Sequence, residues 1–392
     1  MILTRIKPAV AGLGRNACMT RISQSVPTHR APHPARHSGV ARAARGVRAP
    51  GVRRAGGAHP ARVVYRSRPT YRSRPTRKSR PARRFPPARR LALLAALAPL
   101  ALGACADDGT RAGNGDGELR VVATTTHVAD LIRQAGGGRV EVTSLLEPGA
   151  DPHDYDPRPS DVAAIAEADV VFRSGGAVDG WLGELVESAG GSARTISLLE
   201  AVETLELAGE TDPHWWQDPR NAVRAVASIR DALAAADPDR RAGHRRAATA
   251  YTRELRALDR ELAECFERVP ADRRKLVTTH DSLAYLARRY DLEVVGAVIP
   301  SLSTQGQPSA GDVQELVDEI ELEGVSAVFP ESGLSQKLER AIARESGARV
   351  GGELWTDSLG KAGSGADTYL RAMRANADSL VRAMTGGARG CR

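Results

Sequence analysis

Three histidines in this sequence stand where a side chain could bind a metal ion. His153 and His214 each follow an Asp-Pro pair, and an aromatic residue comes within two positions after each of them. Proline fixes the backbone dihedral of the position before each histidine, which limits how far the imidazole ring can move. His280 comes at the end of a run of β-branched residues that reads as a strand. Neutral imidazole is a common metal ligand, so three such residues indicate a shared divalent cation.

The chemistry of such a site depends on the donor atoms around the cation. Aspartate residues near the histidines can accept the second ring N–H and orient the imidazole. Three imidazole nitrogens and one carboxylate oxygen would make a tetrahedral set that suits zinc and that manganese or iron also accept. The sequence contains no glycine-rich phosphate loop and no nucleophile elbow. Metal binding is therefore the chemistry that the residue pattern favours.

The elements that must position these residues alternate between strands and helices from residue 119 onward, a pattern typical of parallel α/β layers. Ligands in such folds bind beyond the carboxyl ends of the strands, where His153 and His280 stand. The predicted strands are 119–124, 140–146, 168–172, 275–279, 293–298 and 327–329.

One long helix is predicted between the two groups of strands. A helix over 221–236 precedes Asp237 and Pro238, which suit the N-cap and the first position of the next helix. That helix is expected over 239–268, about 45 Å long, with apolar residues along one side. The predicted fold class is α/β: two lobes with parallel sheets, joined by one long rigid helix, with the metal site in the cleft between the lobes.

The charge of the chain is divided unevenly along its length. The 56 Lys and Arg residues exceed the 47 Asp and Glu residues, but 23 of the basic residues and none of the acidic ones fall in 1–104. The rest of the chain has 33 basic and 47 acidic residues, a net charge of −14. An acidic body attracts cations and repels phosphate backbones, so no nucleic-acid partner is expected.

The segment 83–104 reads as an export signal. Two arginine pairs precede an apolar stretch of about a dozen residues, which is too short to span a bilayer. The sequence Leu102-Gly103-Ala104-Cys105 resembles the bacterial lipoprotein signal, in which the cysteine carries the lipid. We therefore expect an exported protein that is lipid-anchored at Cys105, on the outer face of the cell membrane or in the periplasm. The predicted boundaries are a disordered basic leader or a start site placed too far upstream (1–82), the signal (83–104), a flexible tether (105–117), an N-terminal lobe (118–236), the linking helix (237–268) and a C-terminal lobe (269–387).

Two other cysteines, Cys265 and Cys391, follow the anchor in the sequence. They could form a disulfide in an oxidising compartment. Because one lies in a predicted helix and the other beside the C-terminus, the sequence leaves their pairing open.

Several motifs follow one another in a distinctive order: Thr124-Thr125-Thr126, Pro148 to His153, Asp212-Pro213-His214-Trp215, Thr279-His280-Asp281, Pro308-Ser309, Pro330-Glu331-Ser332 and Thr356 to Gly360. Together they resemble the substrate-binding proteins of zinc/manganese ABC importers, over residues 121–384. In that family four protein ligands close the metal, and the matching positions are His153, His214, His280 and Asp357; Asp357 is indicated by this resemblance alone.

The resemblance implies a binding protein and not an enzyme. It would capture Zn2+ outside the cytoplasm and deliver it to an ABC permease driven by an ATPase, and we expect it to act as a monomer. Family members with glutamate at the third ligand position tend toward manganese, so His280 favours zinc. Many zinc members also carry a histidine-rich loop, which is missing from 195–211 here, so Mn2+ stays an alternative.

Several further residues have alternative interpretations. Glu331, Asp281 and His127 are candidates for a further ligand or for orienting one, although His127 is expected to be a partly exposed residue near a helix start. His244, among arginines on the linking helix, is expected to be solvated. A secreted zinc hydrolase is the rival class, because a catalytic zinc keeps three protein ligands and one open position. In that case Glu331 or Asp281 would be the base.

Overall fold

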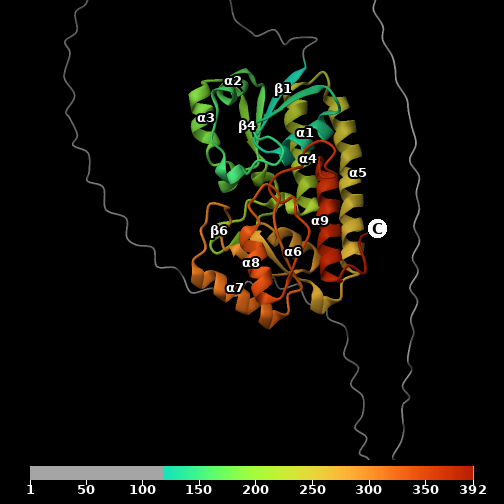
Figure 1. The fold of residues 1–392 in the computed structure, drawn as a ribbon. Helices are drawn as coiled ribbons and strands as arrows, with labels where there is room; N and C mark the ends of the chain where they lie inside the picture. Colours follow the sequence, from blue (N-terminus) through green and yellow to red (C-terminus); the bar gives the residue numbers. More distant parts are fainter. Residues whose placement is uncertain (1–117, 392) are drawn as a thin grey trace, which may run out of the picture. The chain divides into compact units, whose positions relative to one another are not determined.

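Two parallel four-stranded sheets organise residues 118–391, the part of the chain that the computed structural model describes (Figure 1). The predicted leader, the export signal and Cys105 lie outside these residues, so those assignments stay predictions. Within 118–391 no helix is both long enough and apolar enough to cross a membrane.

The first sheet has the strand order β2-β1-β3-β4, and every neighbouring pair is parallel. Helices connect the strands, as the alternating pattern of the sequence predicts. Its strands are β1 (Leu119–Ala123), β2 (Val140–Ser144), β3 (Val170–Arg173) and β4 (Arg194–Ser197), and its helices are α1 (Thr126–Gly136), α2 (Pro159–Glu167) and α3 (Leu182–Ala189).

The second sheet has the order β10-β9-β7-β8, also with all neighbours parallel. This is the topology of the first sheet repeated, with β7, β8, β9 and β10 in the places of β1, β2, β3 and β4. Its elements are β7 (Lys275–His280), α6 (Ala284–Tyr290), β8 (Glu293–Ile299), α7 (Ala310–Glu323), β9 (Ala327–Phe329), α8 (Lys337–Ser346), β10 (Arg349–Val350) and α9 (Tyr369–Met384). We call the two sheets with their helices the first and the second lobe.

All six predicted strands are present, with ends within two residues of the prediction. Four short strands were not predicted: β4, β10 and the antiparallel hairpin β5 (Glu206–Leu207) and β6 (Glu210–Thr211). These four strands are only two to four residues long and contain at most one apolar residue each, so they lack the apolar run by which the other strands were recognised.

The long helix between the lobes is α5, Arg241–Phe266, which follows α4, Pro219–Ala236. Its 26 residues span about 39 Å, somewhat less than predicted. The prediction that Asp237 would be its N-cap is wrong, because the helix begins at Arg241. The Asp237 carboxylate instead accepts a hydrogen bond from the Arg240 N–H (3.1 Å) in the turn between the two helices.

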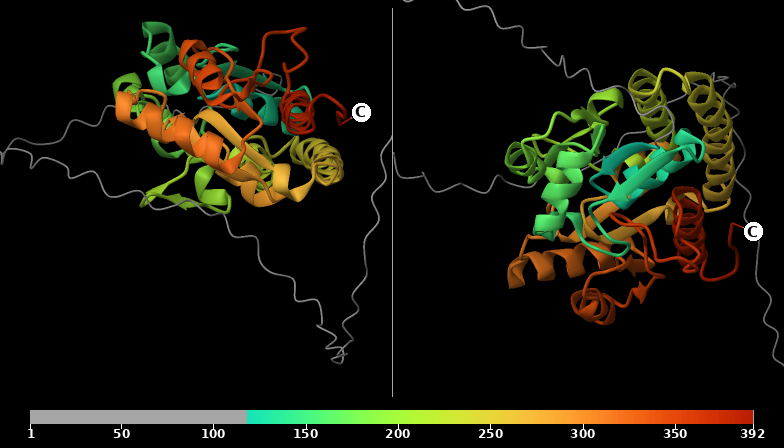
Figure 2. Two further views of the ribbon diagram at one scale, coloured as in Figure 1. Left: turned by 60° about the horizontal axis from the view of Figure 1, so that its bottom comes forward. Right: turned by 90° about the horizontal axis from the view of Figure 1, so that it is seen from above.

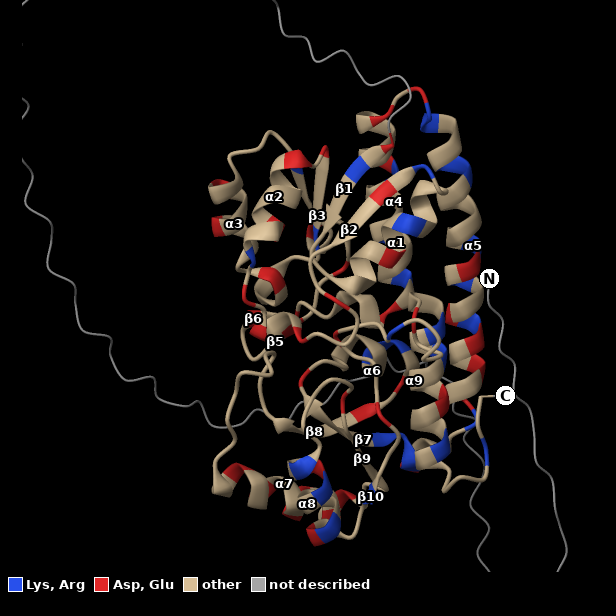
Figure 3. Ribbon diagram, turned by 45° about the horizontal axis from the view of Figure 1, so that its top comes forward, with Lys and Arg blue, Asp and Glu red and all other residues tan. Residues whose placement is uncertain are grey.

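Helix α5 packs against α1 of the first lobe and α9 of the second. In both further views α5 and α9 remain side by side (Figure 2). Lys, Arg, Asp and Glu residues are mixed along α5 (Figure 3), and two ion pairs tie it to the second lobe. These join Asp259 to Arg289 of α6 (2.7 Å) and Glu261 to Arg374 of α9 (2.9 Å).

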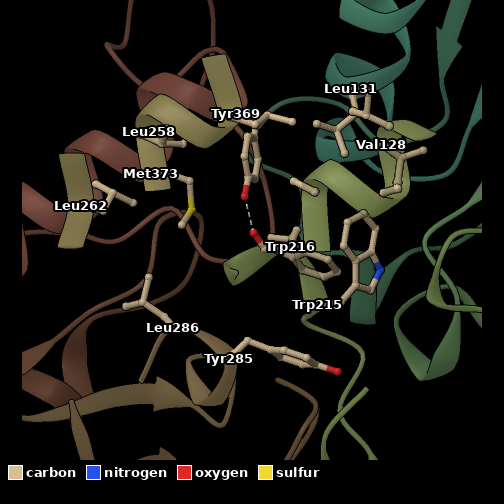
Figure 4. Close-up of a cluster of buried hydrophobic side chains, with 14 of the residues drawn as sticks. Val128, Leu131, Trp215, Trp216, Leu258, Leu262, Tyr285, Leu286, Tyr369 and Met373 are labelled. Carbon is tan, nitrogen blue, oxygen red and sulfur yellow. Dashed lines mark hydrogen bonds between the residues drawn. The ribbon is translucent and has the colours of Figure 1, made fainter. Parts of the chain in front are cut away.

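One hydrophobic core runs through both lobes. It joins residues of α1 to residues of α5, α6 and α9 around the two tryptophans of the His214 segment (Figure 4). Trp215 and Trp216 are fully buried here, as expected for side chains that fill the lobe interface. Because the core is continuous, the lobes cannot separate widely without exposing apolar surface. The labelled members of this core are Val128, Leu131, Trp215, Trp216, Leu258, Leu262, Tyr285, Leu286, Tyr369 and Met373.

The prediction that His244 is solvated is wrong. Its side chain is buried, and Nδ1 lies 3.1 Å from the Gly136 carbonyl oxygen at the end of α1. The arginines around it in the sequence point to solvent because an α-helix turns neighbouring residues to different faces. His244 therefore fastens the start of α5 to the first lobe.

Cys265 and Cys391, whose pairing the sequence left open, form a disulfide. It closes a loop of 126 residues and fastens the C-terminal segment to the end of α5. Two hydrogen bonds accompany it, from Cys391 N–H to Asp378 (2.9 Å) and from Arg268 to the Cys391 carbonyl oxygen (3.1 Å).

Replacing both cysteines by serine should lower the free energy of unfolding by about 2–4 kcal/mol, because the unfolded chain regains the freedom that the closed loop removes. Urea unfolding monitored by circular dichroism would measure the difference. A reducing agent should destabilise the wild-type protein to the same extent and leave the double variant unchanged. Equal stability of the wild-type and variant proteins would show that the disulfide does not form in solution.

Candidate metal centre

Four side chains from four separate segments of the chain meet between the lobes. His153 lies in a 3₁₀ turn after β2, His214 directly before the 3₁₀ turn Trp215–Gln217, His280 at the end of β7, and Asp357 in the segment after β10. One ligand atom from each can be chosen so that all four lie within 4.8 Å of one another. The structure thus brings together the four residues predicted as ligands.

His153 is held through its backbone. Asp151, at the start of the turn, accepts the His153 N–H on Oδ1 (2.9 Å) and the Thr304 hydroxyl of the second lobe on Oδ2 (2.6 Å). The His153 side chain is only 2% exposed. Asp151 thus fixes the turn rather than the ring, which differs from the ring-orienting role expected for the nearby aspartates.

His214 is held through both its backbone and its ring. Asp212 Oδ1 accepts the His214 N–H (2.9 Å) and lies 2.7 Å from Nδ1, and both side chains are fully buried. A carboxylate at this distance requires a proton on Nδ1, which leaves the Nε2 lone pair directed at the other ligands. Here the role expected for the aspartate of an Asp-Pro-His segment is present.

His280 is held in the same way from the second lobe. Glu331, which follows β9, accepts the His280 N–H on Oε1 (3.0 Å) and lies 2.8 Å from Nδ1 through Oε2. Thr278 and Thr356 donate further hydrogen bonds to this carboxylate (3.0 and 2.6 Å). Of the two roles considered for Glu331, the geometry gives it the orienting one.

Asp357 has no such support for its carboxylate. Within residues 118–391 no residue outside the four-residue group donates a hydrogen bond to either oxygen, and the side chain is only 9% exposed. His153 Nε2 is likewise buried without a hydrogen bond in this part of the chain. Buried polar atoms without partners lower the stability of the fold. Where such atoms face one another, a bound cation would be stabilised by them.

The distances between the donor atoms suit a small cation. His280 Nε2 lies 3.3 Å from His214 Nε2 and 3.2 Å from Asp357 Oδ2, and the same oxygen lies 3.2 Å from His153 Nε2. His214 Nε2 is 3.6 Å from Asp357 Oδ1. Ligands about 2.0–2.1 Å from a tetrahedral zinc ion are about 3.3 Å apart. Four contacts, at 3.2–3.6 Å, are therefore close to one edge of a zinc-sized tetrahedron, while the four ligand atoms taken together lie within 4.8 Å of one another.

The carboxylates shift the protonation of these groups. Burial lowers the pKa of His280, but Glu331 and Asp357 outweigh burial and raise it well above 6.5. Burial raises the pKa of Asp357, but His280 and His214 outweigh burial and hold it well below 3.8. Without a metal, a proton on His280 thus supplies positive charge that the site requires.

The other two candidate residues differ in their settings. His127 is buried and stacks on Trp216 with 5.2 Å between ring centroids, so the expected partial exposure is wrong. Burial lowers its pKa to about 4, which keeps the ring neutral at neutral pH. Asp281 is outside the four-residue group, and its backbone N–H bonds to the Ser301 carbonyl oxygen (3.0 Å).

The residues that place Asp357 escaped sequence reasoning. Trp216 and Gln217 donate to the carbonyl oxygen of Thr356 (2.7 and 2.9 Å), directly before the carboxylate. Ser358, directly after it, accepts the Gly149 N–H of the first lobe (2.9 Å). A single sequence carries no signal for these contacts, because they join segments that are far apart along the chain.

Comparison with known proteins gives one family match and related structures. Residues 121–383 match the family described as zinc-uptake complex component A, periplasmic. The chain is 34% identical over 304 residues to the manganese-binding lipoprotein MntA of Bacillus subtilis, covering 74% of this chain and 98% of that protein. It is 29% identical to the metal ABC transporter substrate-binding lipoprotein SloC of Streptococcus mutans, covering 75% and 97%.

Among solved structures, the periplasmic zinc-binding protein TroA of Treponema pallidum is 30% identical and superposes with a TM-score of 0.65. The match covers 68% of this chain and 99% of that one. A cadmium-bound periplasmic metal-binding protein from Candidatus Liberibacter asiaticus shares the fold, with 24% identity and a TM-score of 0.63, over 68% of this chain and 100% of that one. The predicted two-lobed α/β fold with parallel sheets is confirmed.

Zinc binding near neutral pH should release about one proton for each ion bound, because the metal replaces the proton that the raised pKa keeps on His280. Lower pH adds protons that compete for the same nitrogen, so zinc affinity should fall as the pH falls. Calorimetric titration in buffers of different ionisation enthalpy would count the released protons. Zinc binding without proton release, and with the same affinity at pH 6 and 8, would contradict this assignment.

Proposed function

This chain belongs to the periplasmic zinc-uptake complex component A family, and we propose that it captures a divalent cation outside the cytoplasm for an ABC-type importer. The proposed ligands are His153, His214, His280 and Asp357. A permease in the membrane and the ATPase that drives it would receive the ion, as the names of the relatives suggest.

The observation that supports this function best is the convergence of buried donors without partners. Within residues 118–391 no residue outside the four-residue group bonds to the Asp357 carboxylate or to His153 Nε2, and both face the Nε2 atoms of the other two histidines. A cation would satisfy all of these groups at once. A fold that buries this many polar groups around one point is suited to holding an ion tightly.

Zinc is the proposed ion. Three imidazole nitrogens and one carboxylate oxygen are the donor set that tetrahedral zinc prefers. Manganese prefers more oxygen ligands and a higher coordination number. The similar protein of Treponema pallidum, at 30% identity, is named as zinc-binding, which also supports zinc.

Manganese is the second candidate, for two reasons. The Bacillus subtilis relative at 34% identity is named as manganese-binding. The segment 195–211 also contains no histidine, whereas many zinc-binding members of the family carry a histidine-rich loop.

Binding without turnover is the proposed mode of action. A catalytic zinc needs an open position for water, and a fourth protein donor, Asp357, lies 3.2 Å from two of the histidine nitrogens. Glu331, which would be the base of a hydrolase, is already bonded to His280. The geometry therefore favours a closed metal-binding site over the alternative of a secreted zinc hydrolase.

The proposed location is outside the cytoplasm, with a lipid anchor on Cys105. Relatives over most of this chain are named as lipoproteins, and the sequence before Cys105 has the pattern of a lipoprotein signal. A disulfide between Cys265 and Cys391 suits an oxidising compartment.

The metal-stripped protein should bind Zn2+ at least about tenfold more tightly than Mn2+, because three nitrogen ligands and a tetrahedral arrangement favour zinc. Competition against a chelating indicator of known affinity would measure both constants. Each metal that binds should also raise the melting temperature, since it stabilises the folded state.

Tighter binding of manganese than of zinc would reverse the choice of ion and leave the proposed transport role intact. A protein that neither metal binds or stabilises would overturn the proposed function itself. Calcium, which prefers six to eight oxygen ligands, provides the matched negative control.

A further inference from the structure

We infer that Trp216 and Gln217 are positioning residues that set the place of Asp357, so that the loop carrying His214 controls the carboxylate of the opposite lobe. The inference rests on the proposed function, because it concerns the same four-residue site. It assigns a role in metal retention to two side chains that do not themselves reach the site as ligands.

The four proposed ligands differ in how their side chains are held. A carboxylate anchors each histidine: Asp212 and Glu331 hold the rings of His214 and His280, and Asp151 holds the backbone of His153. Within residues 118–391 no residue outside the four-residue group donates a hydrogen bond to the Asp357 carboxylate, whose oxygens lie 3.2–3.6 Å from the three histidine Nε2 atoms. Apart from these ligands, the backbone on either side sets its position.

That backbone is held on its N-terminal side by two donors from the turn that follows His214. The Thr356 carbonyl oxygen accepts one hydrogen bond from Trp216 Nε1 (2.7 Å) and one from Gln217 Nε2 (2.9 Å). This carbonyl belongs to the peptide bond that leads into Asp357, and the peptide unit is planar. Two donors on one carbonyl use both of its lone pairs and fix the orientation of this plane.

Both donors are buried. Trp216 is 1% exposed and Gln217 is fully buried, so their bonds to Thr356 are shielded from water. The Tyr369 hydroxyl of α9 donates to the Trp216 carbonyl oxygen (2.6 Å; Figure 4), and the Trp216 ring stacks on His127. Trp216 therefore acts from a fixed position.

The same turn carries His214. The Gln217 N–H donates to the His214 carbonyl oxygen (3.1 Å). The ligand His214 and the two donors to the peptide bond before Asp357 therefore form one short unit. His214 and Asp357, 143 positions apart in the chain, are thus coupled by four consecutive residues. Metal release requires these two ligands to separate, and the Thr356 bonds oppose that step.

The neighbouring Trp215 provides a matched control. It lies in the same turn and is equally buried, but its Nε1 donates to Ser174 of the first lobe (3.2 Å) and not to the Asp357 peptide. Trp215→Phe removes an indole N–H of the same kind and should perturb the turn to a similar extent. Only a positioning effect distinguishes Trp216 from Trp215.

The experiment is a double-mutant cycle that compares rates of zinc release. The rate is measured after the loaded protein is mixed with excess chelator. Trp216→Phe and Gln217→Met should each accelerate release by about fivefold, the effect of one lost hydrogen bond, while Trp215→Phe should change it by less than about twofold. On an Asp357→Ala background, the Trp216 and Gln217 substitutions should have almost no further effect, because the group they position is gone.

A spectroscopic measurement separates positioning from a general loss of stability. With Co2+ in place of zinc, Trp216→Phe and Gln217→Met should change the visible absorption of the bound ion, and Trp215→Phe should leave it as in the wild type. If Trp216→Phe fails to fold, the smaller change Gln217→Met carries the test alone.

Equal acceleration by Trp215→Phe and Trp216→Phe would overturn the inference, and so would undiminished effects on the Asp357→Ala background. Either result would leave the proposed function standing as long as the wild-type protein binds zinc. A wild-type protein that binds no metal would overturn both.

Discussion

The placing of one buried carboxylate against three imidazole nitrogens governs how the rest of this structure must be arranged. Within residues 118–391 no residue outside the four-residue group donates a hydrogen bond to the Asp357 oxygens, and the Nε2 atoms of the three histidines lie 3.2–3.6 Å from them. With neutral rings, the Nε2 atoms of His214 and His280, 3.3 Å apart, would direct lone pairs at each other, since Asp212 and Glu331 each require a proton on Nδ1. Such an arrangement is stable only with positive charge at its centre, carried by a proton or a metal ion.

The fold supplies the means to hold this arrangement. Two sheets of the same topology place the carboxyl ends of their strands toward one site, so that loops from both lobes can contribute a ligand. The core shared by α1, α5, α6 and α9 then prevents the lobes from separating freely. Opening of the site must therefore consist of small shifts of the ligand loops or tilts of the lobes, not of a wide hinge motion.

Much of the fold and part of the site could be predicted from the sequence, because both depend on local patterns. Buried strands have apolar runs, and a histidine after Asp-Pro or at a strand end is visible in a single sequence. The short strands β4 and β10 have no such run, and the burial of His127 and His244 depends on helices packed from elsewhere in the chain. Asp357 was found only through family resemblance, since its setting is created by Trp216, Gln217 and Ser358 from contacts across the lobes.

X-ray absorption at the zinc edge reports the atoms bound to the ion in the loaded protein. Four-coordinate zinc with three imidazole nitrogens and one carboxylate oxygen, at about 2.0–2.1 Å, is the expected result. Replacing Asp357 by alanine should remove the protein oxygen and leave the three imidazoles. A spectrum of the wild-type protein with fewer than three imidazoles, or with a six-coordinate shell of oxygens, would contradict the proposed ligand set.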